Sequence, residues 1–173
     1  VKRKNKSGVY VYDRETGRTT ELLKPRAYDL YDALWWGEKI LLLATDGKRY
    51  GLNENAQFYT LDPTSGEVAL LAPYEDALGS SVGSDCRLGG GREWVQEGDK
   101  LYFVTTLGGA SQVYCLEEAG EIRPVYTQAG SVDCIDAAEG SLYFVGMQDG
   151  KLQELYRWDC QAQERDQLTT LNE

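Results

Sequence analysis

Histidine is absent from the 173 residues of this chain, which also contain one methionine, four prolines and four cysteines. Without an imidazole the chain cannot assemble a Ser-His-Asp triad, because histidine takes the proton from the serine and returns it to the leaving group. Long apolar runs are also missing, and none approaches the roughly 20 residues that a membrane-spanning helix needs. These absences exclude a complete triad hydrolase and a helical membrane span.

The cysteine spacing gives no sign of a metal site. The cysteines are Cys86, Cys115, Cys134 and Cys160, separated by 29, 19 and 26 residues. No C-x-x-C pair is present, and there is no histidine to complete a zinc site. We therefore expect no metal or other cofactor, and we interpret the cysteines as mostly buried free thiols of a cytoplasmic protein, although spacing alone leaves a disulfide open.

Positive charge is scarce, with 18 Lys and Arg against 28 Asp and Glu and a formal net charge of -10. The acidic residues are spread along the chain, and the only basic cluster is the short KRKNK stretch at its start. Such a chain is repelled by phosphate backbones and anionic lipid surfaces. We expect neither a nucleic acid nor a membrane as a partner.

A G-x-S-x-G pattern at residues 79–83 resembles the nucleophile elbow of serine hydrolases. The elbow needs a strand before the serine and a helix after it, whereas LGSSVGSDCRLGGGR is rich in Gly and Ser on both sides. Lysine replaces histidine as the base in some enzymes, but the lysines here lie in polar turns or in the basic start. We expect Ser81 in an ordered loop, and no catalytic residue in this chain.

A tyrosine-centred strand followed by a turn occurs four times. The copies are VYVYDRETGRTTEL from Val9, FYTLDPTSGEVALL from Phe58, VYCLEEAGEIRPVY from Val113 and LYRWDCQAQERDQL from Leu155. Alternation with a period of two predicts a β-strand with one buried face. Glycines Gly17, Gly66 and Gly120 supply the positive φ of a tight turn in three copies. The fourth copy has no glycine, so the sequence does not predict how its turn is formed.

Two further strand signals precede three of these copies. The second strands are KILLLATDG, KLYFVTTLGG and SLYFVGMQDG, and a shorter candidate lies ahead of each. Four antiparallel strands in about 40 to 55 residues are typical of a propeller blade. We predict an all-β fold, a partial β-propeller of about three and a half four-stranded antiparallel blades. The predicted parts of this single fragment, 1–173, are a half blade (8–23), a blade (27–72), an interblade loop (73–90) and two blades (91–127 and 131–170).

The repeat also predicts where the aromatic side chains lie and how the ends behave. Large β-favouring side chains pack between blades, so we expect the following tyrosines in the core: Tyr10, Tyr59, Tyr114, Tyr143 and Tyr156. Adjacent strand residues face opposite sides, so one of Trp35 and Trp36 should enter a blade interface and the other point away. The chain does not begin with methionine and has no signal peptide, so we expect a piece of a longer polypeptide. Its open blade edges should favour self-association.

Three stretches carry a resemblance to a known family. They are SDCRLGGGREW (84–94), KLYFVTTLGG with QVYCL after it, and SLYFVGMQDGKLQELYRWD running to QLTTLNE (141–173). They resemble the non-catalytic propeller of bacterial prolyl oligopeptidase-family serine peptidases, with the acylaminoacyl-peptidase branch as the nearest match. The resemblance covers nearly the whole chain and is strongest from residue 84 onward. Cys86 in the first motif and the glycine-free turn at 160–163 depart from the pattern.

The resemblance implies a division of labour within a longer protein. In that family an α/β-hydrolase domain follows the propeller and carries the serine, aspartate and histidine, so the lack of histidine here is expected. The propeller would restrict access of short peptides to that domain, and this chain alone would be inactive. The alternative is a fragment of a stand-alone TolB-like propeller that binds proteins or peptides as a scaffold. An independent hydrolase using Ser81 is a third hypothesis.

The loop from Leu78 to Arg92 is the best candidate for a contact site. Arg87 or Arg92 would bind a peptide carboxylate in a bidentate way, or contact the hydrolase domain. The plainer interpretation is that Asp85 pairs with one of these arginines and fixes the interblade connection. The glycines at 89–91 are not followed by G-K-[ST], so they do not predict a phosphate loop.

A second polar loop, residues 44–57, carries Asp46, Asn53 and Glu54. These residues suggest calcium at first sight. Their spacing does not match the D-x-[DN]-x-[DN]-G pattern, so we expect a solvated hairpin loop.

Overall fold

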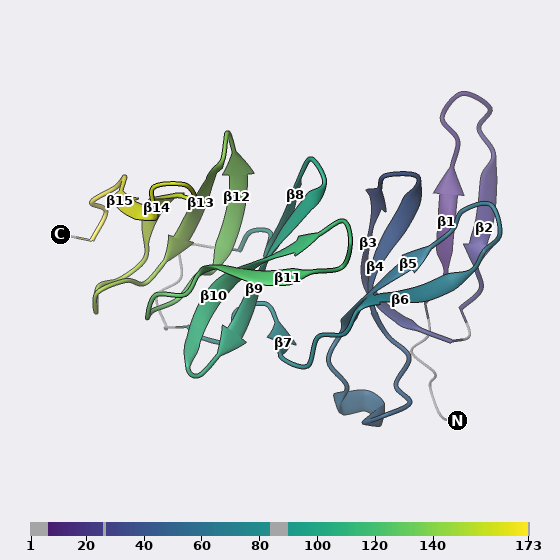
Figure 1. Cartoon of the computed structure of the whole chain (residues 1–173), viewed down its shortest axis with the longest axis horizontal. Coiled ribbons are helices and arrows are strands. Elements are labelled where there is room, and N and C mark those ends of the chain that lie inside the picture. The colour runs from purple at the N-terminus through teal and green to yellow at the C-terminus, as the bar shows by residue number, and fades with distance from the viewer. Residues whose placement is uncertain (1–6, 26, 84–89, 173) are drawn as a thin grey trace. The chain divides into compact units, whose positions relative to one another are not determined.

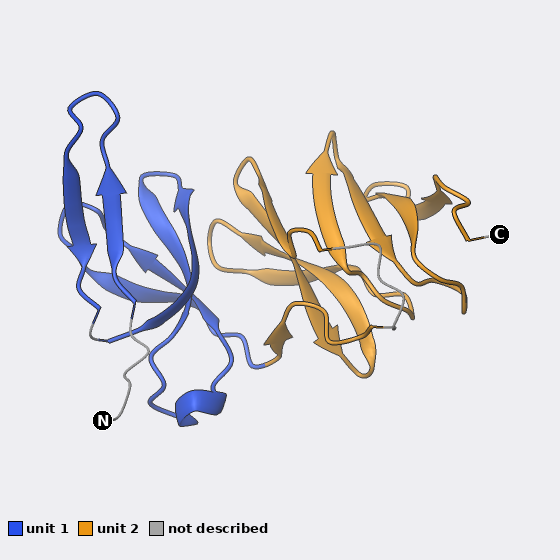
Figure 2. Ribbon diagram, turned by 180° about the vertical axis from the view of Figure 1, so that it is seen from behind, with its two compact units in different colours: residues 1–75 blue, residues 76–173 orange. Residues whose placement is uncertain are grey.

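The computed structural model describes residues 7–25, 27–83 and 90–172. Fifteen β-strands in these ranges form four antiparallel sheets, and the only helix among them is the short 3-10 turn η1 (Gly51–Asn53) (Figure 1). The all-β class predicted from the sequence is confirmed. The chain divides into two compact units, residues 1–75 and 76–173, which are coloured separately in Figure 2.

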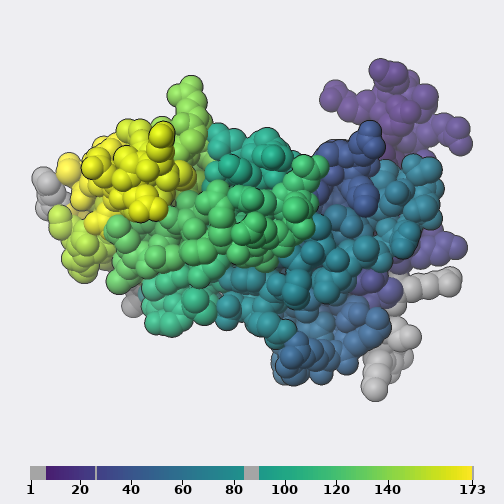
Figure 3. Space-filling model, viewed as in Figure 1, coloured from purple at the N-terminus to yellow at the C-terminus, as the bar shows by residue number. Residues whose placement is uncertain are grey.

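The first unit contains a two-stranded and a four-stranded sheet. Its strands are β1 (Val9–Tyr12), β2 (Thr19–Leu23), β3 (Asp29–Trp36), β4 (Lys39–Thr45), β5 (Gln57–Leu61) and β6 (Val68–Ala72). The first two form a hairpin, and the other four pair in chain order. Val9 of the hairpin packs with Ile40, Leu42 and Leu61 of the larger sheet. The turn end of the hairpin, in purple, protrudes into solvent (Figure 3).

The second unit contains a five-stranded and a four-stranded sheet. Its strands are β7 (Ala77–Leu78), β8 (Trp94–Glu97), β9 (Lys100–Leu107), β10 (Ala110–Glu117), β11 (Ile122–Tyr126), β12 (Cys134–Ala138), β13 (Ser141–Gly146), β14 (Glu154–Asp159) and β15 (Glu164–Gln167). Strands β12 to β15 pair in chain order, and β8 to β11 do likewise. The sequence did not predict β7, which pairs with β9 beyond the end of β8 and lies inside the expected loop 73–90.

The two sheets of the second unit pack face to face through aromatic side chains. Tyr126 from β11 is fully buried and lies 4.8 Å from Phe144 and 5.1 Å from Trp158 between ring centroids. The Trp158 ring meets Tyr126 edge-on, an arrangement favoured by the ring quadrupoles. Cys115 lies in the same core. Large apolar faces of both sheets therefore leave water together, which is the main driving force for this packing.

The turns of the β1–β2, β5–β6 and β14–β15 hairpins follow one pattern, in which an aspartate accepts hydrogen bonds from two backbone N–H groups. The Asp62 carboxylate accepts hydrogen bonds from the backbone N–H groups of Thr64 and Ser65, and Gly66 then adopts a φ of 73°. The glycine-free copy builds the same turn, because Asp159 accepts from residues 161 and 162 and Gln163 adopts a φ of 56°. The turn between β14 and β15, which the sequence did not predict, is thus formed with a non-glycine residue in the left-handed region.

The aromatic predictions are partly confirmed. Tyr59 and Tyr156 are buried, and Tyr114 and Tyr143 are half-buried. The prediction was wrong for Tyr10, whose side chain is 54% exposed, because Val9 and Val11 take the face that packs on the larger sheet. The alternation at the tryptophan pair is confirmed, with Trp36 5% and Trp35 56% exposed.

The loop at residues 44–57 is organised around a buried carboxylate. Glu54 is buried and accepts hydrogen bonds from the Thr45 hydroxyl (2.7 Å) and from the backbone N–H groups of Arg49 and Tyr50 (2.7 and 3.0 Å). The hydrogen bond from Thr45 contributes most to lowering the Glu54 pKa. The expectation of a solvated hairpin loop is therefore wrong for Glu54, whose donors come from nearby residues of the same loop.

Candidate functional site

Of the residues predicted to form a contact site, the structure describes Arg92. Asp85 and Arg87 lie outside the described residues, as does Cys86. Arg92 comes just before β8, and its carbonyl accepts a hydrogen bond of 2.9 Å from the N–H of Ile135 in β12. This bond joins the segment that leads into β8 to the first strand of the next sheet.

Gly91 approaches the neighbouring strand too closely for any side chain. A Cβ at this position would lie 2.4 Å from the Cys134 Cβ and 2.8 Å from its Sγ. Contacts this short do not occur between real Cβ atoms, so the neighbour would have to move. The third glycine of the RLGGGREW stretch is therefore required by packing, and it brings Arg92 against β12.

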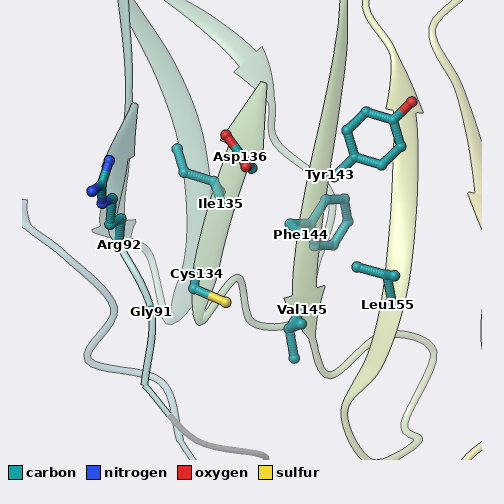
Figure 4. Close-up of a pocket in the computed structure, with 9 residues that line it drawn as sticks. All are labelled: Gly91, Arg92, Cys134, Ile135, Asp136, Tyr143, Phe144, Val145 and Leu155. Atoms are coloured by element: carbon teal, nitrogen blue, oxygen red, sulfur yellow. The ribbon is translucent and has the colours of Figure 1, made fainter. Parts of the chain in front are cut away.

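A cavity of about 450 Å³ lies beside Arg92 on the outward face of the β12–β15 sheet (Figure 4). The Arg92 guanidinium and the Asp136 carboxylate lie toward the same end of the cavity, and the Cys134 sulfur points toward Val145 and Leu155. Arg92 and Asp136 are exposed, whereas the three apolar residues are half-buried. The cavity is thus lined by one cationic side chain, one anionic side chain and three apolar side chains.

The described thiols are free and poorly reactive. Cys115, Cys134 and Cys160 are free, so the expectation of free cysteines is confirmed for these three. Burial raises the pKa of Cys115 to about 11 and is the largest cause of the raised pKa values of Cys134 and Cys160. Because the thiolate is the reactive form, Cys134 lines the cavity as a small apolar group and not as a nucleophile.

Ser81 lies in irregular backbone after β7, beyond a bend at Gly79 whose φ is 90°. The Gly79 N–H donates to the carbonyl of Val104 (2.8 Å), and the Ser81 N–H donates to the Thr106 hydroxyl oxygen (2.8 Å). Val82 and Gly83 are not helical. A nucleophile elbow needs a helix directly after the serine, so the G-x-S-x-G of this chain does not form one.

The residues that lie with Arg92 in the cavity were not predicted from the sequence. Alternation along SVDCIDA already places Cys134 and Asp136 on one face of a strand. The close approach between Gly91 and Cys134 could not be predicted from the sequence, because it depends on how two sheets pack. Within the described ranges no group of three or more His, Cys, Asp and Glu side chains could hold a metal ion, and no helix is long and apolar enough to cross a membrane.

A scan of protein-family models finds no match, and neither does a search of curated proteins. Solved structures do match. The β-propeller domain of the Trilobed protease from Pyrococcus furiosus, with an open velcro topology, is 22% identical with a TM-score of 0.66, over 96% of this chain and 46% of that one. The chain folds as a partial β-propeller.

Two further structures extend the likeness of this propeller. Acylaminoacyl peptidase from Pyrococcus horikoshii is 23% identical with a TM-score of 0.67, over 96% of this chain and 23% of that one. TolB from Acinetobacter baumannii is 17% identical with a TM-score of 0.61, over 97% of this chain and 39% of that one. The chain thus spans less than half of the structures it matches. The resemblance to peptidase propellers is confirmed at the level of the fold.

Proposed function

We propose that this propeller segment is the non-catalytic part of a prolyl oligopeptidase-family serine peptidase, and that it limits access of short peptides to a following α/β-hydrolase domain of the same polypeptide. The observation that carries the proposal is the fold similarity, over 96% of the chain, to an acylaminoacyl peptidase and a protease propeller, together with the motifs at 84–94 and 141–173. The lack of histidine and the non-helical backbone after Ser81 agree with a chain that leaves the chemistry to another domain.

A size filter would require a stiff wall, and hydrogen bonds between the two sheets of the second unit support such a role. Arg165 of β15 donates hydrogen bonds to the Tyr126 hydroxyl (3.1 Å) and to the Gln128 and Gln148 side chains (2.9 and 2.8 Å). These bonds tie the outer strands of two neighbouring sheets together across their interface. A folded protein would have to separate the sheets to pass, whereas a short extended peptide would not.

Arg92 would be the contact between this wall and a peptide. Its exposed guanidinium suits a carboxylate, because the planar fork donates two parallel hydrogen bonds. The half-buried Cys134, Val145 and Leu155 would receive an apolar side chain. We place the protein in the cytoplasm, and the three free cysteines support that placement because reduced thiols are usual there.

A second function is favoured by the TolB match, which covers 97% of this chain. In that case the propeller would bind proteins or peptides as a scaffold and would have no hydrolase partner. Reading the gene beyond the codon for Glu173 separates the two. A G-x-S-x-G followed by Asp and His in an α/β pattern supports the peptidase, and further strand repeats up to a stop codon support the scaffold.

The proposed inactivity of this chain by itself has a direct assay. Incubation with a serine-directed fluorophosphonate and an acyl-peptide chromogenic substrate should give neither labelling nor product. Labelling of Ser81 would overturn the proposal, since it would require a base that activates this serine.

A further inference from the structure

The β1–β2 hairpin is the outer half of a sheet. Its first strand VYVYD matches FYTLD of β5 and LYRWD of β14, which are the third strands of their sheets. The first two strands of a complete sheet, β3–β4 or β12–β13, are called the inner hairpin here. In complete sheets the inner hairpin pairs with the third strand. Within the described residues β1 pairs with β2 alone.

The unpaired edge of β1 carries backbone N–H and C=O groups in the alternation with which another strand could pair. The Asp13 N–H donates to the Arg18 carbonyl (2.9 Å), and the pairs Val11 with Thr20 and Tyr12 with Thr19 follow. Antiparallel pairs alternate between those that exchange hydrogen bonds and those that do not. Val11 therefore bonds to β2, and the N–H and C=O groups of Tyr10 and Tyr12 point to the open edge.

Part of the neighbouring β3–β6 sheet is exposed to solvent beside the edge of β1. Trp35 and Ala33 of β3 lie opposite Ile40 and Leu42 of β4 and share their face. The β4 residues are buried in the core with Val9, whereas Trp35 is 56% exposed. A cavity of about 250 Å³ between β1 and β3 is lined by residues 9–12, 33–35 and 40.

The second unit shows what covers these positions when a sheet is complete. Ala137 of β12 corresponds to Trp35, since Ala137 lies opposite Leu142 as Trp35 lies opposite Ile40. Ala137 is half-buried and packs against the cluster that contains Val95 and Tyr102 of the β8–β9 inner hairpin. Tyr156 corresponds to Tyr10 and is 1% exposed, with Phe144 of its own inner hairpin stacked at 5.3 Å. Trp35 and Tyr10 of the first unit are therefore exposed, whereas their counterparts in the second unit contact an inner hairpin.

We propose that the β1 edge, Ala33 and Trp35 form a docking site for one β-hairpin of the inner type. Its second strand pairs antiparallel with β1 and joins it from the N-terminal side, as β13 leads into β14. An aromatic residue of that strand lies opposite Tyr10, as Phe144 lies opposite Tyr156. The outward side chains of the hairpin cover Trp35. A second copy of this chain pairing β1 with β1 is the competing occupant.

Two grafts test the proposal on the full chain. In one, residues 131–153 replace residues 1–7 directly before Gly8, and in the other residues 92–111 do so. We expect amide exchange at Tyr10 and Tyr12 to slow about tenfold or more, because edge amides become ladder amides. Hydroxyl-radical labelling of Trp35 should fall toward the level of Trp36.

Proline provides the matched control. Tyr12→Pro removes an N–H that points to the open edge and leaves the bonds to β2, so the ungrafted chain should keep a protected Val11 amide. In the grafted chain the same substitution should abolish the new protection at Tyr10. Val11→Pro should disturb the hairpin in both chains, since it removes a bond to β2.

Three results would overturn the proposal. The first is unchanged exchange at Tyr10 and Tyr12 in both folded grafts. The second is protection of these amides in the ungrafted chain that rises with protein concentration, which would assign the edge to a second copy. The third is failure of both grafted chains to fold while the ungrafted chain folds, because a site of the stated geometry accepts its hairpin.

Discussion

The Arg165 guanidinium donates a hydrogen bond of 2.8 Å to the Oε1 atom of Gln148, which is fully buried. The same oxygen accepts from the Tyr126 hydroxyl (2.7 Å), while the Gln148 amide donates to the Ser131 carbonyl (2.8 Å). One arginine therefore completes a buried polar group at the interface of two sheets. Without it, the acceptor would lose a charged donor that no water replaces easily.

Arg165→Met should lower the free energy of unfolding by about 1 to 3 kcal/mol, because buried acceptors lose their charged partner. Arg157→Met is the matched control, since Arg157 forms partly exposed ion pairs with Asp159 and Asp166 and one hydrogen bond of 3.2 Å to the Ser141 hydroxyl, and its loss should cost about 0 to 1 kcal/mol. Urea unfolding followed by circular dichroism measures both. Equal losses in the two variants would contradict the role of Arg165.

Gln163→Gly should stabilise the protein by about 1 kcal/mol, because the left-handed conformation at φ 56° is strained for a residue with a Cβ. Gly66→Ala tests the equivalent turn in reverse and should destabilise by a similar amount, since Gly66 has a φ of 73° and an added Cβ meets no atom closer than 3.5 Å. Thermal unfolding of both variants checks the pair. A loss of stability in Gln163→Gly would show that the glutamine side chain contributes more than the strain costs.

Gly91→Ala should cost about 1 to 3 kcal/mol of stability, because the new methyl group collides with Cys134. Gly90 is the natural control, since an added Cβ there meets nothing within 4 Å and its φ is not positive, so Gly90→Ala should change stability by less than about 0.5 kcal/mol. Urea unfolding of the two variants side by side gives the comparison. Equal stabilities would mean that the approach of residue 91 to β12 is not needed.

The C-terminal residues 168–172 should detach in acid. Hydrogen bonds from the Leu171 N–H, the Thr169 hydroxyl and Asn172 lower the pKa of Glu154 from 4.5 to about 2. A carboxylate with a depressed pKa stabilises the fold fully above its unfolded pKa, and this contribution is lost as the pH falls through the folded value. The protection factors of the Leu171 and Asn172 amides, which correct for the intrinsic pH dependence of exchange, should therefore fall between about pH 4.5 and pH 2.

Glu154→Gln is the control for that acid transition. The glutamine does not titrate, so the protection factors of these two amides should already be low at neutral pH and should no longer change over the acid range. A transition that persists in Glu154→Gln would point to another carboxylate.

Arg92→Met should weaken binding of a short peptide with a free carboxylate and an apolar last residue by about tenfold, the usual worth of a charge-assisted hydrogen bond at a surface. The tripeptide Ala-Ala-Leu and its C-terminal amide form a matched pair of probes, and chemical-shift titration reports on Val145 and Leu155. The amide should bind the original chain as weakly as the acid binds Arg92→Met. If acid and amide bind alike, the carboxylate role proposed for Arg92 is wrong.

The strand pattern was predictable because it depends on side-chain alternation within short segments. The four tyrosine-centred copies correspond to β1, β5, β10 and β14. Tyr10 could not be placed correctly, since its exposure depends on which strands cover its face. The turn at Gln163 was also missed, because the carboxylate of Asp159 organises it without a glycine.

The candidate site was also only partly predictable from the sequence. Its arginine was chosen from a Gly-rich motif, but Cys134 and Asp136 are more than 40 residues away in sequence and reach Arg92 through sheet packing. Strand β7 was missed because two residues give no periodicity to detect. The division of the chain at 27–72, 73–90, 91–127 and 131–170 stays a prediction.

The buried Cys115 and the half-buried Cys134 and Cys160 affect how the protein responds to oxidative stress. Peroxide attacks the thiolate, and burial raises the pKa of Cys115 to about 11, so almost none of that thiolate exists at neutral pH. The raised pKa values of Cys134 and Cys160 act in the same direction. We therefore expect these three thiols to react slowly with hydrogen peroxide, under oxidant that would modify a cysteine with a low pKa.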